Sequence, residues 1–279
     1  MSTEREPVDQ MQRLLEVMRQ LRDPESGCPW DLRQDFSTIV PYSLEEVYEL
    51  VDAIEAEDFE QVADELGDVL FQVVFYAQLG AERGLFDFTE VVQRITDKLV
   101  RRHPHVFEAR DEPAVLQRHI SESGVEARWE YIKQQERQQK RLEGVLDDVP
   151  LALPALSRAQ KLQKRAARIG FDWPDATGVW VKVDEEIAEL MEAIANKDQC
   201  SIEAEIGDVL IAVVNLARHF DVDAEAATRL ANARFESRFR EMERSAKEEG
   251  SALESESLDR LEERWQKAKR RLVSDGLAT

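Results

Sequence analysis

Residues 64–72 have the sequence DELGDVLFQ, and residues 204–212 have the sequence AEIGDVLIA. In both stretches a glutamate and an aspartate stand three residues apart, and an apolar run follows them. Residues three apart share one face of an α-helix. Each stretch therefore predicts a helix that carries two carboxylates at the edge of a buried face, and the near repetition predicts that the chain contains this helix twice.

Three glutamates upstream of each stretch repeat at the same separation. The first-half acids are Glu45, Glu46, Glu49, Glu65 and Asp68, and 140 positions later stand Glu185, Glu186, Glu189, Glu205 and Asp208. A looser repeat pairs RWEYIK at Arg128 with RWQKAK at Arg264. We interpret the chain as a tandem duplication, with one domain at 1–136, a linker at 137–152 and a second domain at 153–279. Gly144 and Pro150 fall in that linker and break helices.

The apolar residues follow helical periods in both halves. Leu44, Val47, Tyr48 and Val51 form a single stripe at i, i+3, i+4 and i+7. Further helices are predicted from Phe59 to about Gly84 and from Phe88 to about Arg102, and a turn is predicted at 198–201. Glycine and proline are sparse, at 11 and 9 of 279 residues, and no alternating strand pattern stands out. The predicted fold class is all-α.

The net charge of the protein limits the kinds of molecule that it can bind. With 58 acidic and 37 basic residues the net charge is −21, and such a surface repels nucleic-acid phosphates and anionic membranes. The longest apolar run, 69–76, is too short to cross a bilayer. Cys28 and Cys200 form no CxxC pair, and the first ten residues are polar. We therefore expect a cytoplasmic protein with reduced thiols and no nucleic-acid or membrane partner.

The repeated acids predict a metal site between two antiparallel helices. Residues three or four apart share a helix face, and a short connection makes the two helices neighbours. Converging carboxylates need a compensating charge, and Mg²⁺ prefers such oxygen ligands. The predicted ligands in the second half are Glu186, Glu189, Glu205 and Asp208. A secondary site is predicted in the first half at Glu46, Glu49, Glu65 and Asp68.

Two other interpretations of the acids are open at this point. A solvated acidic face is common in a chain this rich in glutamate. A di-iron bundle needs Glu-x-x-His on inward faces, and neither block contains that pattern. Five acids repeated with unchanged spacing favour a metal site over both.

At these residues the chain resembles the MazG family of nucleoside triphosphate pyrophosphohydrolases. The family pattern is EExxE, a spacer and ExxD on paired helices, and segments such as GCPWD, FQVVFYAQ, RRHPHVF, LPALSRAQK and GFDW add to the resemblance. It implies tandem helical domains that become four-helix-bundle-like on dimerisation. It also implies Mg²⁺-dependent hydrolysis of NTPs and dNTPs to monophosphate and pyrophosphate, with broad base tolerance and the main activity in the second half.

The resemblance also implies substrate contacts from a basic pair, Arg234 and Arg238, with the triphosphate and from Trp265 with the nucleotide. Trp129 is the first-half equivalent of Trp265. From the residues themselves, Lys182 lies one helical turn before Glu186 and within reach of a phosphate, whereas Tyr42 holds the matching place in the first half. Both halves keep a basic pair, since Lys98 and Arg102 match Arg234 and Arg238.

The predicted mechanism has the four second-half acids bind Mg²⁺ while Lys182 and the arginine pair neutralise the phosphates. Water attacks, activated by the metal or by Glu185 as general base. The catalytic residues are thus predicted to be Lys182, Glu185 and Glu186. The sequence has no Walker loop and no Nudix motif. The alternatives are a first half that acts as a non-catalytic nucleotide sensor or dimerisation scaffold, and a whole chain that acts as a helical adaptor.

Overall fold

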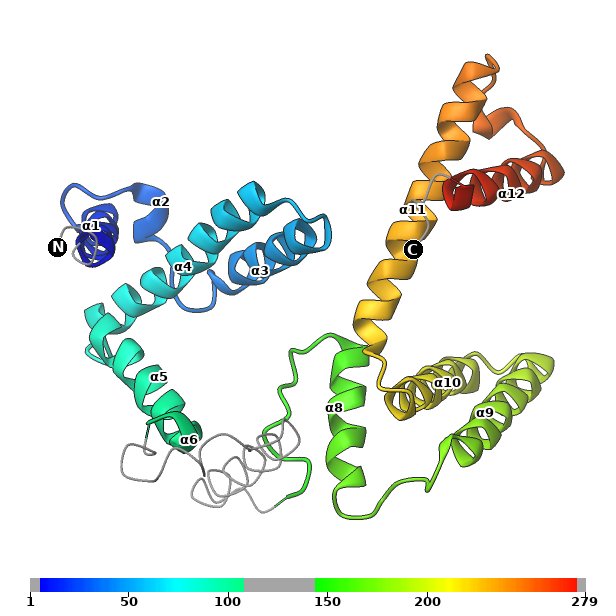
Figure 1. Ribbon diagram of the computed structural model, residues 1–279, viewed down its shortest axis with the longest axis horizontal. Coiled ribbons are helices and arrows are strands. Elements are labelled where there is room, and N and C mark those ends of the chain that lie inside the picture. Colours follow the sequence, from blue (N-terminus) through cyan, green and yellow to red (C-terminus); the bar gives the residue numbers. More distant parts are fainter. Residues whose placement is uncertain (1–5, 108–143, 275–279) are drawn as a thin grey trace, which may run out of the picture. The chain divides into compact units, whose positions relative to one another are not determined.

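The computed structural model describes residues 6–107 and 144–274. Every regular element in these two ranges is helical (Figure 1), which confirms the all-α prediction. The chain divides into two compact units, Met1–Lys133 and Gln134–Thr279. None of the helices in the described ranges is long and apolar enough to cross a membrane.

The first unit is built around a helical hairpin. Its helices are α1 (Glu6–Leu21), α2 (Pro29–Leu32), α3 (Val40–Glu55), α4 (Phe59–Glu82), α5 (Phe88–Arg102) and α6 (Pro104–Phe107). Helix α3 packs against α4, and α1 and α5 also contact α4. The core cluster consists of Met18, Ile39, Val74, Phe75 and Leu79. Helix α4 thus supplies three of these five side chains, two of them from the apolar run after Asp68.

One arginine ties the hairpin to the segment that precedes it. The Arg22 side chain is 7% exposed and forms a salt bridge of 2.6 Å with Glu82 at the end of α4. The same guanidinium donates to the backbone oxygens of Asp31 and Gln34. An arginine with several acceptors is the ordinary way to bury a charge, and this one holds α1, α2 and α4 together.

The second unit repeats the hairpin and adds a longer arm. Its elements are α8 (Ala155–Ala167), α9 (Ala176–Asn196), α10 (Gln199–His219), α11 (Ala224–Glu248), the 3₁₀ turn η2 (Leu253–Ser255) and α12 (Leu258–Ser274). Helix α9 packs against α10, α8 contacts both α10 and α11, and α12 folds back on α11 (Figure 1). The acidic repeat therefore lies on α3 and α4 in the first unit and on α9 and α10 in the second.

Aspartate caps set where three of the four hairpin helices, α4, α9 and α10, begin. Asp58 accepts a hydrogen bond from the Gln61 amide at the start of α4, and Asp175 accepts from the Thr177 amide at the start of α9. Asp198 accepts from the amides of Cys200 and Ser201. Such a cap satisfies backbone donors that the first turn leaves open, and in α4, α9 and α10 it fixes how far the acids stand from the start of the helix. Helix α3 has no such side-chain cap.

The predicted helix boundaries hold closely, with one correction. The helices predicted from Phe59 and from Phe88 are confirmed. The turn predicted at 198–201 is wrong beyond Asp198, because the Asp198 cap allows α10 to begin at Gln199. Residues 144–154 contain no helix, as their glycine and prolines predict. Arg128, Trp129 and the first part of the predicted linker lie outside the described residues.

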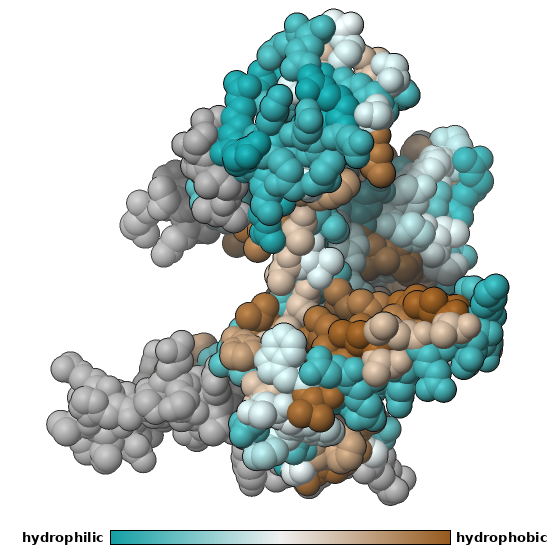
Figure 2. All heavy atoms as spheres, turned by 90° about the vertical axis from the view of Figure 1, so that its right-hand side faces the viewer, coloured by the Kyte–Doolittle hydropathy of each residue, from teal (hydrophilic) through white to brown (hydrophobic). Residues whose placement is uncertain are grey.

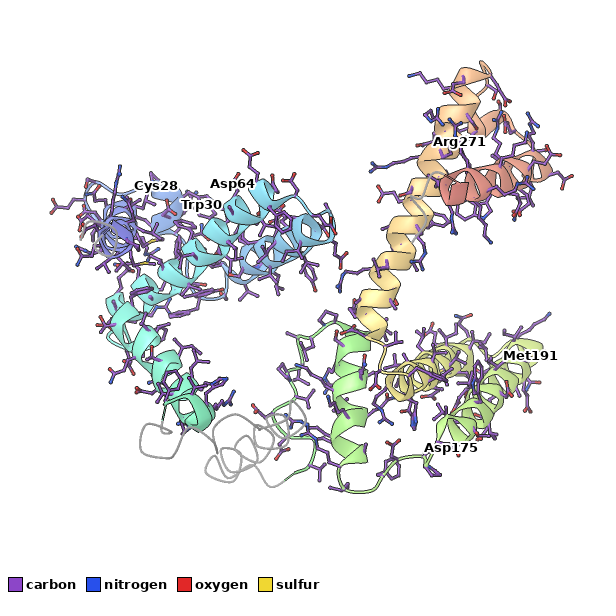
Figure 3. The ribbon with its side chains drawn as sticks, in the orientation of Figure 1. Cys28, Trp30, Asp64, Asp175, Met191 and Arg271 are labelled. Carbon is purple, nitrogen blue, oxygen red and sulfur yellow. The ribbon has the colours of Figure 1, made fainter. Side chains whose placement is uncertain are left out.

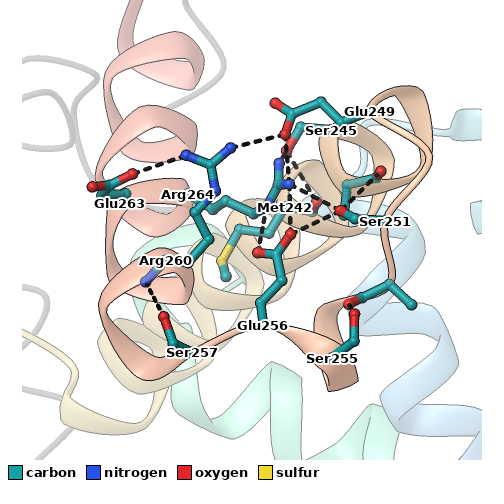
Figure 4. Close-up of polar contacts among 12 residues, drawn as sticks. Met242, Ser245, Glu249, Ser251, Ser255, Glu256, Ser257, Arg260, Glu263 and Arg264 are labelled. Atoms are coloured by element: carbon teal, nitrogen blue, oxygen red, sulfur yellow. Dashed lines mark hydrogen bonds and ion pairs between the residues drawn. The ribbon is translucent and has the colours of Figure 1, made fainter.

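A buried arginine anchors α12 to α11 (Figure 4). The Arg264 side chain is 3% exposed and pairs with Glu256 and Glu249, each at 2.7 Å. It also donates to the hydroxyls of Ser245 and Ser251. Hydrogen bonding from Arg264, supported by Ser251, lowers the pKa of Glu256 to about 2, so this carboxylate is ionised wherever the protein is folded at ordinary pH.

Candidate metal and nucleotide site

Three carboxylates of the second unit converge between α9 and α10. One oxygen each of Glu186, Glu205 and Asp208 lies within 4.8 Å of the other two. Glu186 is buried at 6% exposure, Glu205 is half-buried and Asp208 is exposed. The cluster therefore runs from the helix interface out to solvent. This is the geometry in which a hard divalent cation can bind protein oxygens on one side and keep waters or phosphate oxygens on the other.

Glu189, the fourth predicted ligand, stands at the margin of this group. It lies outside the set of three, on the exposed side of α9 one turn after Glu186. Desolvation and the neighbouring carboxylates of Glu186 and Glu205 raise its pKa. The charges of the cluster thus act on Glu189, although its carboxylate does not belong to the group of three.

Lys182 supplies the positive charge of this site in the free protein. Its Nζ lies 2.6 Å from an oxygen of Glu186 and 2.8 Å from an oxygen of Glu185. The two carboxylates raise the pKa of Lys182, so the ammonium stays charged. A charged carboxylate at a position this deeply buried needs such a partner. In the free protein, the residue that we expect to contact phosphate is therefore bound to two of the acids.

The first unit brings a similar but not identical set together. One oxygen each of Glu46, Glu49 and Glu65 lies within 4.8 Å of the other two, while Asp68 lies outside the three. Glu65 on α4 is the buried member, at 6% exposure. Desolvation and then the nearby carboxylates raise the pKa of both Glu46 and Glu49. The buried acid thus sits on opposite helices in the two units.

The first-unit counterpart of Lys182 is an aromatic contact. Tyr42 stands one turn before Glu46, and its ring meets the Trp30 ring edge-on with centroids 5.5 Å apart. Both side chains are about two-fifths exposed. Trp30, which is labelled in Figure 3, lies on α2 of the first unit. A phenol cannot neutralise a carboxylate at neutral pH, so this place carries no compensating charge.

The predicted nucleotide contacts lie on the arm of the second unit. Trp265 of α12 packs against Phe235 of α11, with ring centroids 5.2 Å apart, and the Arg238 guanidinium lies 5.8 Å from the Trp265 ring centroid. The groove beside them measures about 710 Å³ and is lined by Phe235, Phe239, Leu258, Leu261 and Trp265 among others. Within the described residues, α12 packs on α11 while the acids lie between α9 and α10 (Figure 1).

The sequence patterns did not single out the charged groups that hold these parts in place. In the sequence, Arg264 stands out only as part of a repeat, yet it is the buried anchor of α12. Asp172 accepts two hydrogen bonds from Arg218, which connects the segment before α9 to the end of α10. The lone signal for Arg264 was its place beside Trp265 in a repeated RW pair. Nothing in the spacing indicated Asp172 with Arg218, which are 46 residues apart.

Comparison with known proteins finds the same family domain in both halves of the chain. A sequence model of the MazG nucleotide pyrophosphohydrolase domain matches residues 34–107 and 180–242, which contain the two acidic hairpins. The chain is 52% identical over 268 residues to the nucleoside triphosphate pyrophosphohydrolase of Escherichia coli K12, covering 95% of this chain and 99% of that protein. It is 43% identical to the nucleoside triphosphate pyrophosphohydrolase/pyrophosphatase MazG of Thermotoga maritima, covering 92% of this chain and 94% of that protein.

Proposed function

This chain belongs to the MazG nucleotide pyrophosphohydrolase family, and on that premise we propose that it hydrolyses nucleoside triphosphates to the monophosphate and pyrophosphate, chiefly at the second unit. The observation that carries the proposal for this site is the cluster of Glu186, Glu205 and Asp208 with Lys182 beside it. The cluster places carboxylate oxygens, which can bind a metal ion, beside the ammonium group of Lys182, which can bind a phosphate.

The residues present fit a magnesium ion. All three clustered donors are carboxylates, the hard ligands that Mg²⁺ prefers over imidazole or thiolate. Glu186, Glu205 and Asp208 would hold the ion, with Glu189 at the margin of the site. When bound, Mg²⁺ would neutralise phosphate charge and polarise the bond under attack. The first-unit cluster has the same donor chemistry.

The side chains of the second unit divide the remaining work. Lys182 would exchange its carboxylate partners for a phosphate oxygen, which frees Glu185 to accept a proton from the attacking water. Arg234 and Arg238 of α11 would neutralise the rest of the triphosphate. Trp265 would stack on the base, a contact that every base can make. Stacking on the base face alone would account for the broad base tolerance that we propose.

The reaction type is tested by the products. We expect the full-length protein with Mg²⁺ to convert each NTP and dNTP of a panel into the monophosphate and pyrophosphate, because the chain has no phosphate loop that would cradle a γ-phosphate for transfer. Chromatography with pyrophosphate detection measures this directly. Nucleoside diphosphate and orthophosphate as the main products would refute the proposal, and absence of any turnover would favour a helical adaptor.

We also propose that the protein is a homodimer. Many apolar side chains of the α9–α10 hairpin are exposed, including Ile187, Met191, Ile194, Ile206 and Leu210, each between 43% and 66%. Figure 2, which views the right-hand side of Figure 1, shows a band of apolar side chains on that face. Figure 3 places Met191 toward the opposite end of α9 from Asp175. A large exposed apolar face is typical of a subunit interface.

Solution mass tests the dimer. We expect light scattering at micromolar concentration to give twice the chain mass of 32.1 kDa. Met191→Asp should shift the mass toward a single chain because it places a charge in the proposed interface. Leu151→Asp is the matched control, since Leu151 is 85% exposed in the segment before α8. A monomer mass for the unmodified protein would rule the dimer out.

A further inference from the structure

The two acidic clusters differ in how their most buried carboxylate is compensated. In the second unit the buried acid is Glu186, and Lys182 binds it at 2.6 Å. In the first unit the buried acid is Glu65, at 6% exposure, and its Oε2 is buried without a hydrogen-bond partner. A buried carboxylate oxygen with no partner is costly, and native structures rarely keep one unless a water, proton or ion satisfies it.

The Glu65 side chain is held toward the cluster. Its Oε1 accepts a hydrogen bond from Gln61 Nε2, one turn earlier on α4. One Glu65 oxygen lies within 4.8 Å of an oxygen of Glu46 and of Glu49, both on α3. The second unit has no such brace, because the matching Ser201 donates to Asp198 instead. Gln61 thus orients Glu65 while leaving Oε2 available to a ligand.

No lysine or arginine of the described residues 6–107 forms an ion pair with Glu46, Glu49 or Glu65. Tyr42 occupies the place of Lys182 and brings no charge. Three carboxylates at this separation repel one another. The three carboxylates of the first unit therefore lack a positive side chain like Lys182 of the second unit. A bound metal ion could supply the missing positive charge.

We propose that the first unit holds a resident divalent cation at Glu46, Glu49 and Glu65 without any nucleotide. The ion joins α3 to α4, satisfies Glu65 Oε2 and replaces the charge that Lys182 supplies in the second unit. The second unit, where Lys182 competes for Glu186, takes up metal well only when a triphosphate draws Lys182 away. The last statement rests on the proposed function, whereas the resident ion does not.

The test uses full-length protein and Mn²⁺ alone, with free Mn²⁺ measured by electron paramagnetic resonance. We expect one tightly bound Mn²⁺ per chain in the absence of nucleotide. Glu65→Gln should lose it, and the matched second-unit variant Glu205→Gln should retain it. Because Glu65→Gln alters a buried group, Glu49→Gln at an exposed position should give the same loss, and circular dichroism checks that each variant is folded.

A charge exchange sharpens the test. Tyr42→Lys places an internal cation beside Glu46 and should weaken Mn²⁺ binding by about tenfold or more, the size expected for one charged hydrogen bond. Absence of tight binding in the unmodified protein would mean that a water or a proton satisfies Glu65 instead of a metal ion, and would overturn the proposal. Binding that survives Glu65→Gln but disappears in Glu205→Gln would overturn it too. A protein that binds one ion in this way yet releases no pyrophosphate would sustain the resident ion and refute the proposed function.

Discussion

Replacing Asp208 with asparagine should reduce kcat/KM for NTP hydrolysis by roughly a hundredfold or more, while Asp68→Asn should cause a loss at least about tenfold smaller. Asp208 belongs to the three-carboxylate group of the second unit. Its replacement removes one negative charge and one ligand oxygen from the place where the metal is proposed to bind. Loss even of residues that only support metal ligands typically reduces affinity or activity by about 10–100-fold, so loss of a direct ligand should cost more.

The variant should fold normally, which is what makes the kinetic loss interpretable. Asp208 is exposed, and the carboxylates around it repel one another. Neutralising one of several crowded charges relieves repulsion in the metal-free protein, so the free energy of unfolding should not fall. Thermal unfolding without metal measures this. A large drop in melting temperature would mean that Asp208 acts structurally and would void the kinetic argument.

The comparison with Asp68→Asn decides whether the two units are unequal. Asp68 occupies the matching position in the first unit and is likewise exposed, so the two substitutions are chemically identical. Both should be assayed on the same NTP panel at saturating Mg²⁺ and at limiting Mg²⁺. Equal losses would mean two working sites. A larger loss from Asp68→Asn would mean that the first unit is the principal catalyst.

Much of the fold followed from local pattern because each signal was strong and short-range. The helical periods of the apolar residues predicted α4 and α5 almost to the residue. The repeat of five acids predicted which two helices of each unit would meet. Local capping explains the one boundary that was wrong, since Asp198 can start a helix as well as close a turn.

The detailed geometry of the acids depended on residues outside the repeat. Identical spacing produced two different groups of three, with Glu49 included in the first unit and Asp208 in the second. Among the side chains that differ nearby are Tyr42 against Lys182 and Gln61 against Ser201, and these differ in which acid, if any, they bind. A spacing argument places residues on a helix face but does not choose among their hydrogen-bond partners.

The burial of Arg264 illustrates a second limit. An arginine in an amphipathic helix is expected at the surface, yet this one is among the most buried polar residues described. Its acceptors, Glu249 and Glu256, lie 15 and 8 positions earlier, beyond any helical period. Only the fold of α12 back on α11 brings them together (Figure 4). Trp265, which the repeat did single out, is the next residue and lines the groove.

Lys182→Met should change metal binding and catalysis in opposite directions. In the free protein Lys182 binds both Glu185 and Glu186, so its ammonium competes with a metal ion for Glu186. Removing the charge should therefore strengthen binding of Mn²⁺ to the second unit without nucleotide, where a second bound ion should become detectable. With substrate present, the same variant lacks one charged contact to the triphosphate.

The kinetic cost follows from that missing contact. A hydrogen bond to a charged group contributes roughly 1.5–3 kcal/mol, which corresponds to a fall in kcat/KM of about tenfold to a hundredfold. Lys182→Arg keeps the charge with a different shape and should retain more activity than Lys182→Met without gaining the second Mn²⁺. Tyr42→Phe is the first-unit match and should leave both measurements nearly unchanged, because the Tyr42 ring carries no charge to lose. If Lys182→Met lowered metal affinity and activity together, Lys182 would be acting through the structure of the cluster, and the exchange of its partners between carboxylate and phosphate would be wrong.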